Sequence, residues 1–183
     1  MENSIVEQIL LNLYDAIDAG FSYRAKKMFW IDDLFVSSNW KTFSKEEFRK
    51  GFKNLKREKF ITQKEQYDGS IIVSLSEKGK LRALNLKFKL LSHKKEPWDK
   101  KWRMIIFDIP NTHRKARDAI RYRLKGAGFR EIQESMFVYP YDCERVLRDF
   151  IELFKLEKYV RFALLDYIDG QENLMRLFKL EQG

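Results

Sequence analysis

Apolar residues recur at helical spacing at the start of the chain. Ile5, Ile9, Leu13 and Ile17 follow one another at intervals of four, which predicts an amphipathic helix over residues 4–19. Gly20 follows directly and favours the end of that helix. The aromatic-rich stretch after it has no clear period, and we expect a second helix over residues 24–35.

A third helix, over residues 44–60, is predicted by a capping box. Ser44 and Glu47 stand three residues apart before an apolar run, the spacing at which each side chain caps the other's backbone. Strand-like runs at 60–66 and 70–75 follow, with an Asp68-Gly69 pair between them that favours a tight hairpin. A further helix is expected over 78–91. Helix followed by hairpin is the order of a winged helix-turn-helix, so we predict such a domain over residues 1–92.

The polar, proline-containing run at 93–101 predicts a linker. Beyond it the pattern predicts strand, helix, two strands, helix and strand, which is the βαββαβ order of a ferredoxin-like domain over 102–183. The fold class is therefore α+β. Both helices of such a domain cover one face of the sheet, and the other face favours a dimer. The short amphipathic segment 171–180 could pack on its own domain or reach across that dimer. The expected elements are strands at 102–109, 129–135, 137–139 and 159–168, and helices at 114–125 and 142–156.

Composition narrows the class of protein. The chain of 183 residues is 44% hydrophobic, which is typical of a globular protein, and carries a net charge of +9. Basic residues exceed acidic ones in both halves, which indicates a polyanionic partner for both. No apolar run approaches the roughly 20 residues of a membrane span, and the acidic N-terminus is unlike a signal peptide. We therefore expect a cytoplasmic protein without a membrane partner. Cys143 is the single cysteine, which excludes an intramolecular disulfide and a cysteine-based zinc site.

The helix at 44–60 gives the strongest binding signal. Phe48, Phe52 and Leu55 fall on one side of it, and basic residues fan out beside them. The alternative is an ordinary solvated helix face, but the hairpin that follows favours contact with double-stranded DNA, with Arg49, Lys53 and Arg57 facing the major groove. The predicted DNA-binding residues are Lys45, Arg49, Lys50, Lys53, Lys56, Arg57 and, near the tip of the wing, Lys64.

A second basic helix follows the first strand of the C-terminal domain. Its cations lie opposite Ala116, Ile120 and Leu124. They could contact phosphates without reading sequence, and a plain charged outer face explains them equally well. These possible phosphate contacts are Arg114, Arg117, Arg121 and Lys125.

Asp108 is the one candidate for catalysis. It stands at the carboxyl end of the strand that opens the C-terminal domain. A lone carboxylate is a poor site for Mg²⁺, which prefers several oxygen ligands, so a metal site would need Asp108 from two protomers. The structural alternative is that Asp108 caps the following turn or pairs with a nearby arginine. We predict no other cofactor, and an enzymatic activity stays uncertain.

Two families share features with the C-terminal half. The run IIFDIP ending at Pro110, followed by an arginine-rich helix and by Gln133, Ser135 and Phe137 in a Q-x-S-x-F pattern, resembles the small CRISPR-associated endonuclease of spacer acquisition. That resemblance implies Asp108 as a metal-binding catalytic residue of a dimer. The whole layout is more similar to PaaX-type transcriptional repressors, which place a winged helix before such a domain.

We therefore predict a homodimeric, sequence-specific DNA-binding repressor. Two protomers related by a two-fold axis would present two basic helices to successive major grooves, so the expected operator is an inverted repeat. The rival prediction is a metal-dependent nuclease, or a spacer-acquisition subunit with a CRISPR-adaptation partner, acting through Asp108. A third is an architectural component of a nucleoprotein complex.

Overall fold

The computed structural model describes residues 4–18, 23–26, 43–93 and 96–180. Contacts divide the chain into two compact units, residues 1–86 and 87–183, and each is described by itself. The predicted domain limits of 1–92 and 102–183, with a linker between them, stay a prediction. None of the helices among these residues is long and apolar enough to cross a membrane.

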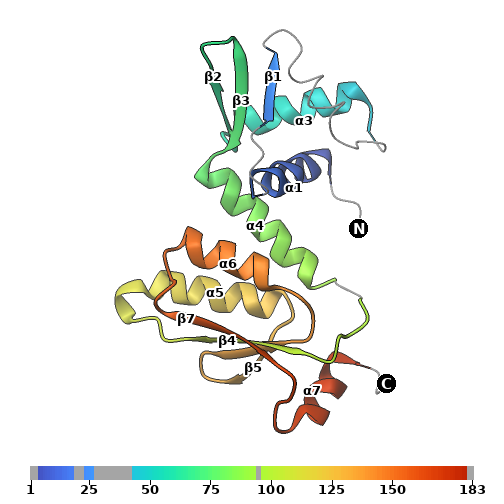
Figure 1. Cartoon of the computed structure of the whole chain (residues 1–183), viewed down its shortest axis with the longest axis vertical. Helices are drawn as coiled ribbons and strands as arrows, with labels where there is room; N and C mark the ends of the chain where they lie inside the picture. The colour runs from blue at the N-terminus through green and yellow to red at the C-terminus, as the bar shows by residue number, and fades with distance from the viewer. Residues whose placement is uncertain (1–3, 19–22, 27–42, 94–95, 181–183) are drawn as a thin grey trace. The chain divides into compact units, whose positions relative to one another are not determined.

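The first unit packs two helices against a small sheet (Figure 1). Its three strands are antiparallel in the order β1-β3-β2. Strand β1 therefore pairs with the edge of β3 that β2 leaves open. Helix, strand, helix and hairpin follow one another in the described residues, which is the order expected from the sequence, and the winged-helix domain itself stays a prediction. The elements are α1 (Ile5–Asp18), β1 (Tyr23–Lys26), α3 (Lys45–Arg57), β2 (Ile61–Glu65), β3 (Ser70–Leu75) and α4 (Glu77–Leu91).

One prediction in this unit is corrected. The helix expected over 24–35 does not begin there, because Tyr23–Lys26 form strand β1, paired with β3 from Tyr23↔Val73 to Lys26↔Ser70. The sequence offers no clear period at this point, and pairing with a distant strand decides the local conformation. Residues 27–42 lie outside the described part of the chain. The other predicted helices and strands of this unit are confirmed to within three residues at each end.

The core of the first unit holds α1 and α3 close together. Ile9 and Leu10 of α1 and Phe48, Phe52 and Leu55 of α3 are all buried. A Cβ at Gly51 would lie 3.1 Å from Ile9 Cδ1, so the two helices approach closely here. A Cβ at Gly79, in the first turn of α4, would lie 1.9 Å from the carbonyl oxygen of Phe60, so only glycine fits at that position.

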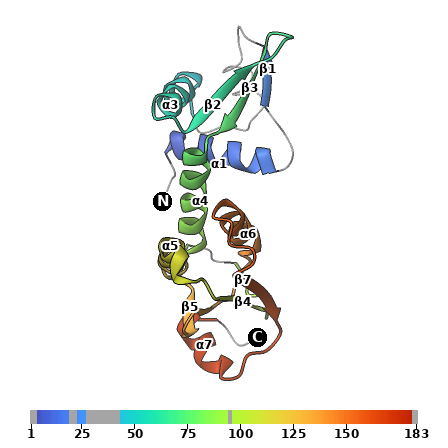
Figure 2. The same ribbon diagram turned by 90° about the vertical axis from the view of Figure 1, so that its left-hand side faces the viewer.

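The second unit is the predicted ferredoxin-like sandwich. Its sheet is fully antiparallel in the order β5-β6-β4-β7, and α5 and α6 lie together on one face (Figures 1 and 2). This is the sheet order that a βαββαβ chain gives in a ferredoxin-like fold. The elements are β4 (Trp102–Phe107), α5 (Arg114–Gly126), β5 (Arg130–Gln133), β6 (Met136–Tyr139), α6 (Glu144–Leu153), β7 (Val160–Leu165) and α7 (Gln171–Phe178), with a single 3₁₀ turn at Asn111–His113.

Helix α7 packs on its own unit, which is one of the two arrangements that the sequence allows for residues 171–180. Leu174 of α7 is buried against Trp102 and Val138 on the sheet face opposite α5 and α6. The Trp102 indole Nε1 donates a hydrogen bond to Gln171 Oε1 at 3.1 Å. Helix α7 therefore covers part of the second sheet face, while Ile106 on the same face stays 38% exposed.

The segment that enters the second unit is fixed by a buried arginine. Arg103 is 8% exposed and forms a bidentate pair with Asp99, with both nitrogen–oxygen distances at 2.6 Å. Its Nη1 also donates to the carbonyl oxygens of Lys101 and Pro140, at 2.9 and 2.8 Å. The guanidinium holds the pKa of the Asp99 carboxyl below its usual range.

Candidate nucleic-acid interface

Helix α3 starts where the predicted capping box places it. Ser44 Oγ accepts a hydrogen bond from the Glu47 backbone N–H at 3.2 Å, and Glu47 Oε2 accepts one from the Ser44 N–H at 2.7 Å. The bond from the Ser44 backbone lowers the pKa of Glu47. These reciprocal bonds satisfy two backbone donors that would otherwise lack partners, and they set the first turn of the helix.

The two faces of α3 separate as the sequence predicts. The apolar stripe of Phe48, Phe52 and Leu55 is fully buried, and every one of the six predicted cations is exposed. The buried stripe fixes the rotation of the helix, so the basic face can only point to solvent. The exposed cations are Lys45, Arg49, Lys50, Lys53, Lys56 and Arg57.

The partners of Lys50 and Arg57 are local and exposed. Lys50 Nζ lies 2.9 Å from Glu46 Oε1, a contact that raises the pKa of Lys50, and both side chains are about three-quarters exposed. Arg57 donates to Asn54 Oδ1 at 3.1 Å. Solvent screens exposed pairs of this kind, so they add little to stability and a phosphate oxygen can replace the partner.

The hairpin β2–β3 lies directly beside the end of α3. The Phe60 N–H donates to the Leu55 carbonyl oxygen at 2.9 Å, so only a short turn separates helix and strand. Lys78 Nζ donates to the carbonyl oxygen of Glu58 at 2.8 Å and lies 4.5 Å from the centroid of the Phe60 ring. Lys78 thus joins the start of α4 to the turn between α3 and β2. The sequence did not predict this contact, because the partners of Lys78 lie some 20 positions earlier in the chain. Lys64 on β2 is exposed, and its predicted contact with DNA stays a prediction.

The cations of α5 are mostly bound within their own unit. Arg121 and Lys125 both reach Glu131 of β5, at 2.5 and 2.8 Å. Arg117 Nη1 donates to Asn111 Oδ1 at 3.2 Å and to the Ile109 carbonyl oxygen at 3.4 Å. The pKa of Glu131 is lowered, first by the hydrogen bond from Lys125 and then by the charge of Arg121. Of the four possible phosphate contacts, Arg114 is the most open, facing Asp118 at 3.5 Å with about three-quarters of its side chain exposed.

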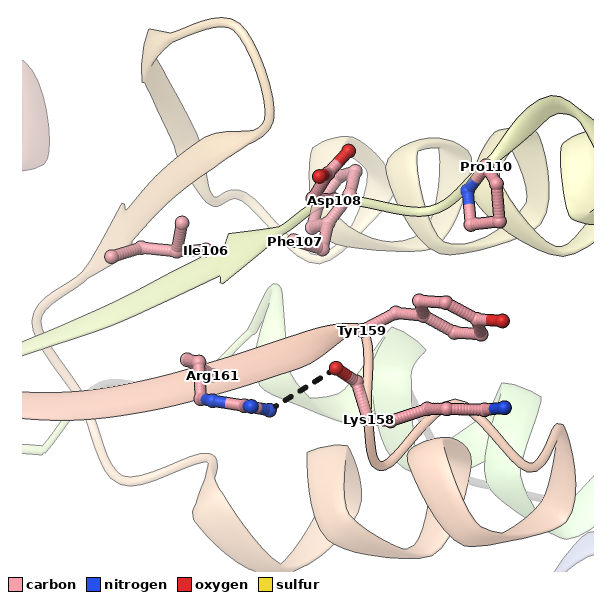
Figure 3. Close-up of a pocket in the computed structure, with 7 residues that line it drawn as sticks. All are labelled: Ile106, Phe107, Asp108, Pro110, Lys158, Tyr159 and Arg161. Carbon is pink, nitrogen blue, oxygen red and sulfur yellow. Dashed lines mark hydrogen bonds between the residues drawn. The ribbon is translucent and has the colours of Figure 1, made fainter.

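Asp108 is exposed just beyond the end of β4. Its backbone N–H donates to the Tyr159 carbonyl oxygen at 2.9 Å, which holds the main chain beside β7. Its carboxylate makes neither a hydrogen bond nor an ion pair with the described residues. The capping or pairing role considered from the sequence is therefore not seen in this part of the chain. In Figure 3 the carboxylate lies on the side away from Tyr159 and Arg161.

Two pockets meet at Asp108. One is lined by Ile106, Pro110, Lys158, Tyr159 and Arg161 (Figure 3), and the other, of about 650 Å³, brings Asp118, Glu134 and two arginines to the same aspartate. Sequence reasoning found no second acid for Asp108, because Asp118 and Glu134 come from α5 and from the β5–β6 turn. No group of three histidine, cysteine, aspartate or glutamate side chains in the described residues is close enough to hold a metal ion. Metal binding by Asp108, with Mg²⁺ as the candidate ion, stays a prediction that needs a second protomer.

The fold and the sequence together define the class of the second unit. Its βαββαβ order, antiparallel sheet and helices on one face make it a ferredoxin-like domain. Residues 95–175 match the family model described as the PaaX protein central Cas2-like domain. This part of the chain is therefore similar to the PaaX-type central domain, and the resemblance found in the sequence is confirmed for these residues. No curated protein matches the chain.

Proposed function

We propose that this protein is a PaaX-type transcriptional regulator that represses its target genes by binding an operator as a homodimer. The observation that carries the proposal is the basic face of α3, six exposed cations opposite a fully buried stripe, with a hairpin directly after the helix. In winged-helix proteins a helix in this position enters the major groove. The PaaX-type central domain in the same chain supports a regulatory role.

The test begins with selection of bound duplexes from a random pool by the wild-type protein. The variant Arg49→Glu with Lys53→Glu should lose at least about 100-fold in affinity for the selected duplex, because two groove-facing cations become repulsive. Lys155→Glu with Lys179→Glu is the matched control, since it changes the net charge equally at exposed positions of the other unit. Equal binding by the wild type and the α3 variant would overturn the proposal.

The proposed dimer uses the second face of the ferredoxin-like sheet. Helix α7 covers the Trp102 end of that face. At the other end Ile106 is 38% exposed, and the half-buried side chains of Met104 and of Met136, the cross-strand partner of Ile106, lie beside it. A second copy would remove these apolar side chains from water. Sedimentation should show a dimer for the wild type and a monomer for Ile106→Glu. A selected site without two-fold symmetry would contradict the inverted-repeat operator.

One observation keeps the nuclease as a second candidate. Asp108 is exposed, its carboxylate has no partner among the described residues, and it lines a groove with Asp118 and Glu134. A dimer could bring further oxygen ligands to that groove. Labelled duplex incubated with Mg²⁺ should stay intact if the protein is a regulator. Metal-dependent cleavage that Asp108→Ala abolishes would establish the nuclease instead.

A further inference from the structure

Two opposite charges border the apolar patch on the second face of the ferredoxin-like sheet. Strand β4 pairs Ile106 with Met136 of β6 on one side and with Arg161 of β7 on the other. Directly paired residues of antiparallel strands project from the same face, so the Arg161 side chain starts beside exposed Ile106. Asp108 follows Ile106 by two residues and lines the same pocket, of about 390 Å³, as Ile106 and Arg161 (Figure 3). An exposed anion and an exposed cation therefore lie at the edge of one apolar patch.

Neither charge is neutralised by the described residues of its own chain. The Asp108 carboxylate makes no hydrogen bond or ion pair with them, and in Figure 3 it lies on the side away from Arg161. The Arg161 Nη1 donates to three main-chain carbonyl oxygens of its own strand and the preceding turn, at 3.0 to 3.4 Å, and meets no carboxylate in the described part of the chain. By contrast, Arg103 and Arg121 of the same unit each bind a carboxylate.

A second copy of the chain supplies a partner for both charges at once. In a two-fold dimer the same patch faces itself, so a contact from one residue to another is repeated in the opposite direction. An axis that passes between Asp108 and Arg161, close to Ile106, lays each charge over the opposite charge of the second copy. The interface then holds two ion pairs around an apolar centre of Ile106 and Met136 side chains. An apolar centre with a polar rim is the usual organisation of a protein interface.

We propose that Asp108 is an interface residue that pairs with Arg161 of the partner subunit across the two-fold axis. The inference rests on the proposed function and deepens it, because it names the contacts that orient the dimer. Apolar contact alone is non-directional, whereas two symmetric charge pairs fix one register of the two sheet faces. In this arrangement a guanidinium group of the partner, rather than a metal ion, neutralises the Asp108 carboxylate.

The test is a charge swap in the whole chain, with the dimer dissociation constant measured by sedimentation equilibrium at low salt. Asp108→Arg and Arg161→Asp should each weaken the dimer at least about tenfold, because each brings like charges together twice in the interface. The double variant Asp108→Arg with Arg161→Asp restores both pairs in reverse and should return to within about threefold of the wild type. Lys158→Asp is the matched control, since it reverses a positive charge at the same pocket but outside β7, and it should dimerise like the wild type.

Thermal unfolding separates a lost contact from a lost fold. In the monomeric Ile106→Glu background, either reversal should change the unfolding temperature by no more than about 2 °C, because both side chains are exposed there. A dimer of wild-type strength in either single variant, or a double variant no stronger than the weaker single one, would overturn the inference. That result leaves the proposed regulator and its dimer intact if Ile106→Glu is still a monomer. A wild-type protein that stays monomeric would remove the proposed dimer and this inference together.

Discussion

Helices α3 and α5 are both basic and amphipathic, yet their cations differ in exposure and in the partners that they contact. All six cations of α3 point to solvent, and those with known partners face weak, exposed ones. On α5, Arg121 and Lys125 share Glu131, and Arg117 bonds Asn111 and a carbonyl oxygen. A basic arc is available to a binding partner where its cations are solvent-exposed, and less so where acceptors of the same domain hold them in half-buried pairs. Charges held within a domain stabilise that domain, and exposed charges remain available to a polyanion.

The largest effect we expect on stability concerns Arg103, the most buried cation by exposed area among the described residues of the second unit. Asp99→Ala removes the carboxylate that holds it and leaves the guanidinium with carbonyl partners only. We expect a loss of about 2 kcal/mol in the free energy of unfolding, measured by urea denaturation followed by circular dichroism. Lys53→Ala on α3 should change the free energy of unfolding by less than about 0.5 kcal/mol. Equal losses in the two variants would break the comparison.

The same pair predicts a dependence on pH. The pKa of Asp99 is lowered in the folded protein, first by the hydrogen bond from Arg103, so the pair stabilises the fold above the ordinary carboxyl pKa. That contribution falls as the pH drops through the lowered value, when the carboxyl takes up a proton. The difference between wild type and Asp99→Ala should therefore shrink in acid.

An intermediate effect is expected at the start of α3. Ser44→Ala removes one side of the capping box and should lower the free energy of unfolding by about 1 kcal/mol. Because the buried stripe still fixes the rotation of the helix, affinity for the selected duplex should fall by less than about threefold at temperatures where the protein is folded. A fall as large as that of the charge-reversal variant would mean that helix order, rather than charge, controls binding.

The smallest effect concerns the acceptor that binds the α5 cations. Glu131→Gln should lower the free energy of unfolding by less than about 1 kcal/mol, because the Glu131 side chain is still 24% exposed and the pair is screened. The pKa of Glu131 is lowered in the fold, so this loss should be present at neutral pH and disappear in acid. If Glu131→Gln instead raises affinity for duplex DNA, the freed Arg121 and Lys125 bind phosphates and the two helices are more alike than the structure indicates.

Features set by neighbouring residues were predicted well from the sequence. The capping box of Ser44 and Glu47 and the hairpin at Asp68-Gly69 depend on side chains within four positions, and both are confirmed. The rotation of α3 was predictable because Phe48, Phe52 and Leu55 alone define its buried side. The βαββαβ order was predictable because each strand and helix carries its own period.

Features set by distant residues were missed. Strand β1 replaced the start of an expected helix because its pairing partner lies some 50 positions away in β3. The acceptor for Arg121 and Lys125 stands on a separate strand, and no local pattern marks Glu131 as that acceptor. The groove at Asp108 likewise combines residues from the end of β4, from α5 and from the β5–β6 turn. Only the three-dimensional fold brings such groups together.

The bond between Arg103 and Asp99 has a consequence for how this chain can be shortened or fused. Asp99 lies in the run that the sequence marks as a linker, yet the Trp98 ring packs at a tilt against Trp102, with the ring centroids 4.8 Å apart, and the Trp98 Nε1 donates to the Lys101 carbonyl oxygen. A fragment that began at Trp102 would lose the contact between the Trp98 and Trp102 rings and leave Arg103 without its carboxylate. Residues 98–101 therefore belong to any fragment made of the second unit, and we expect a fragment that starts ahead of residue 98 to be more stable than one that starts at Trp102.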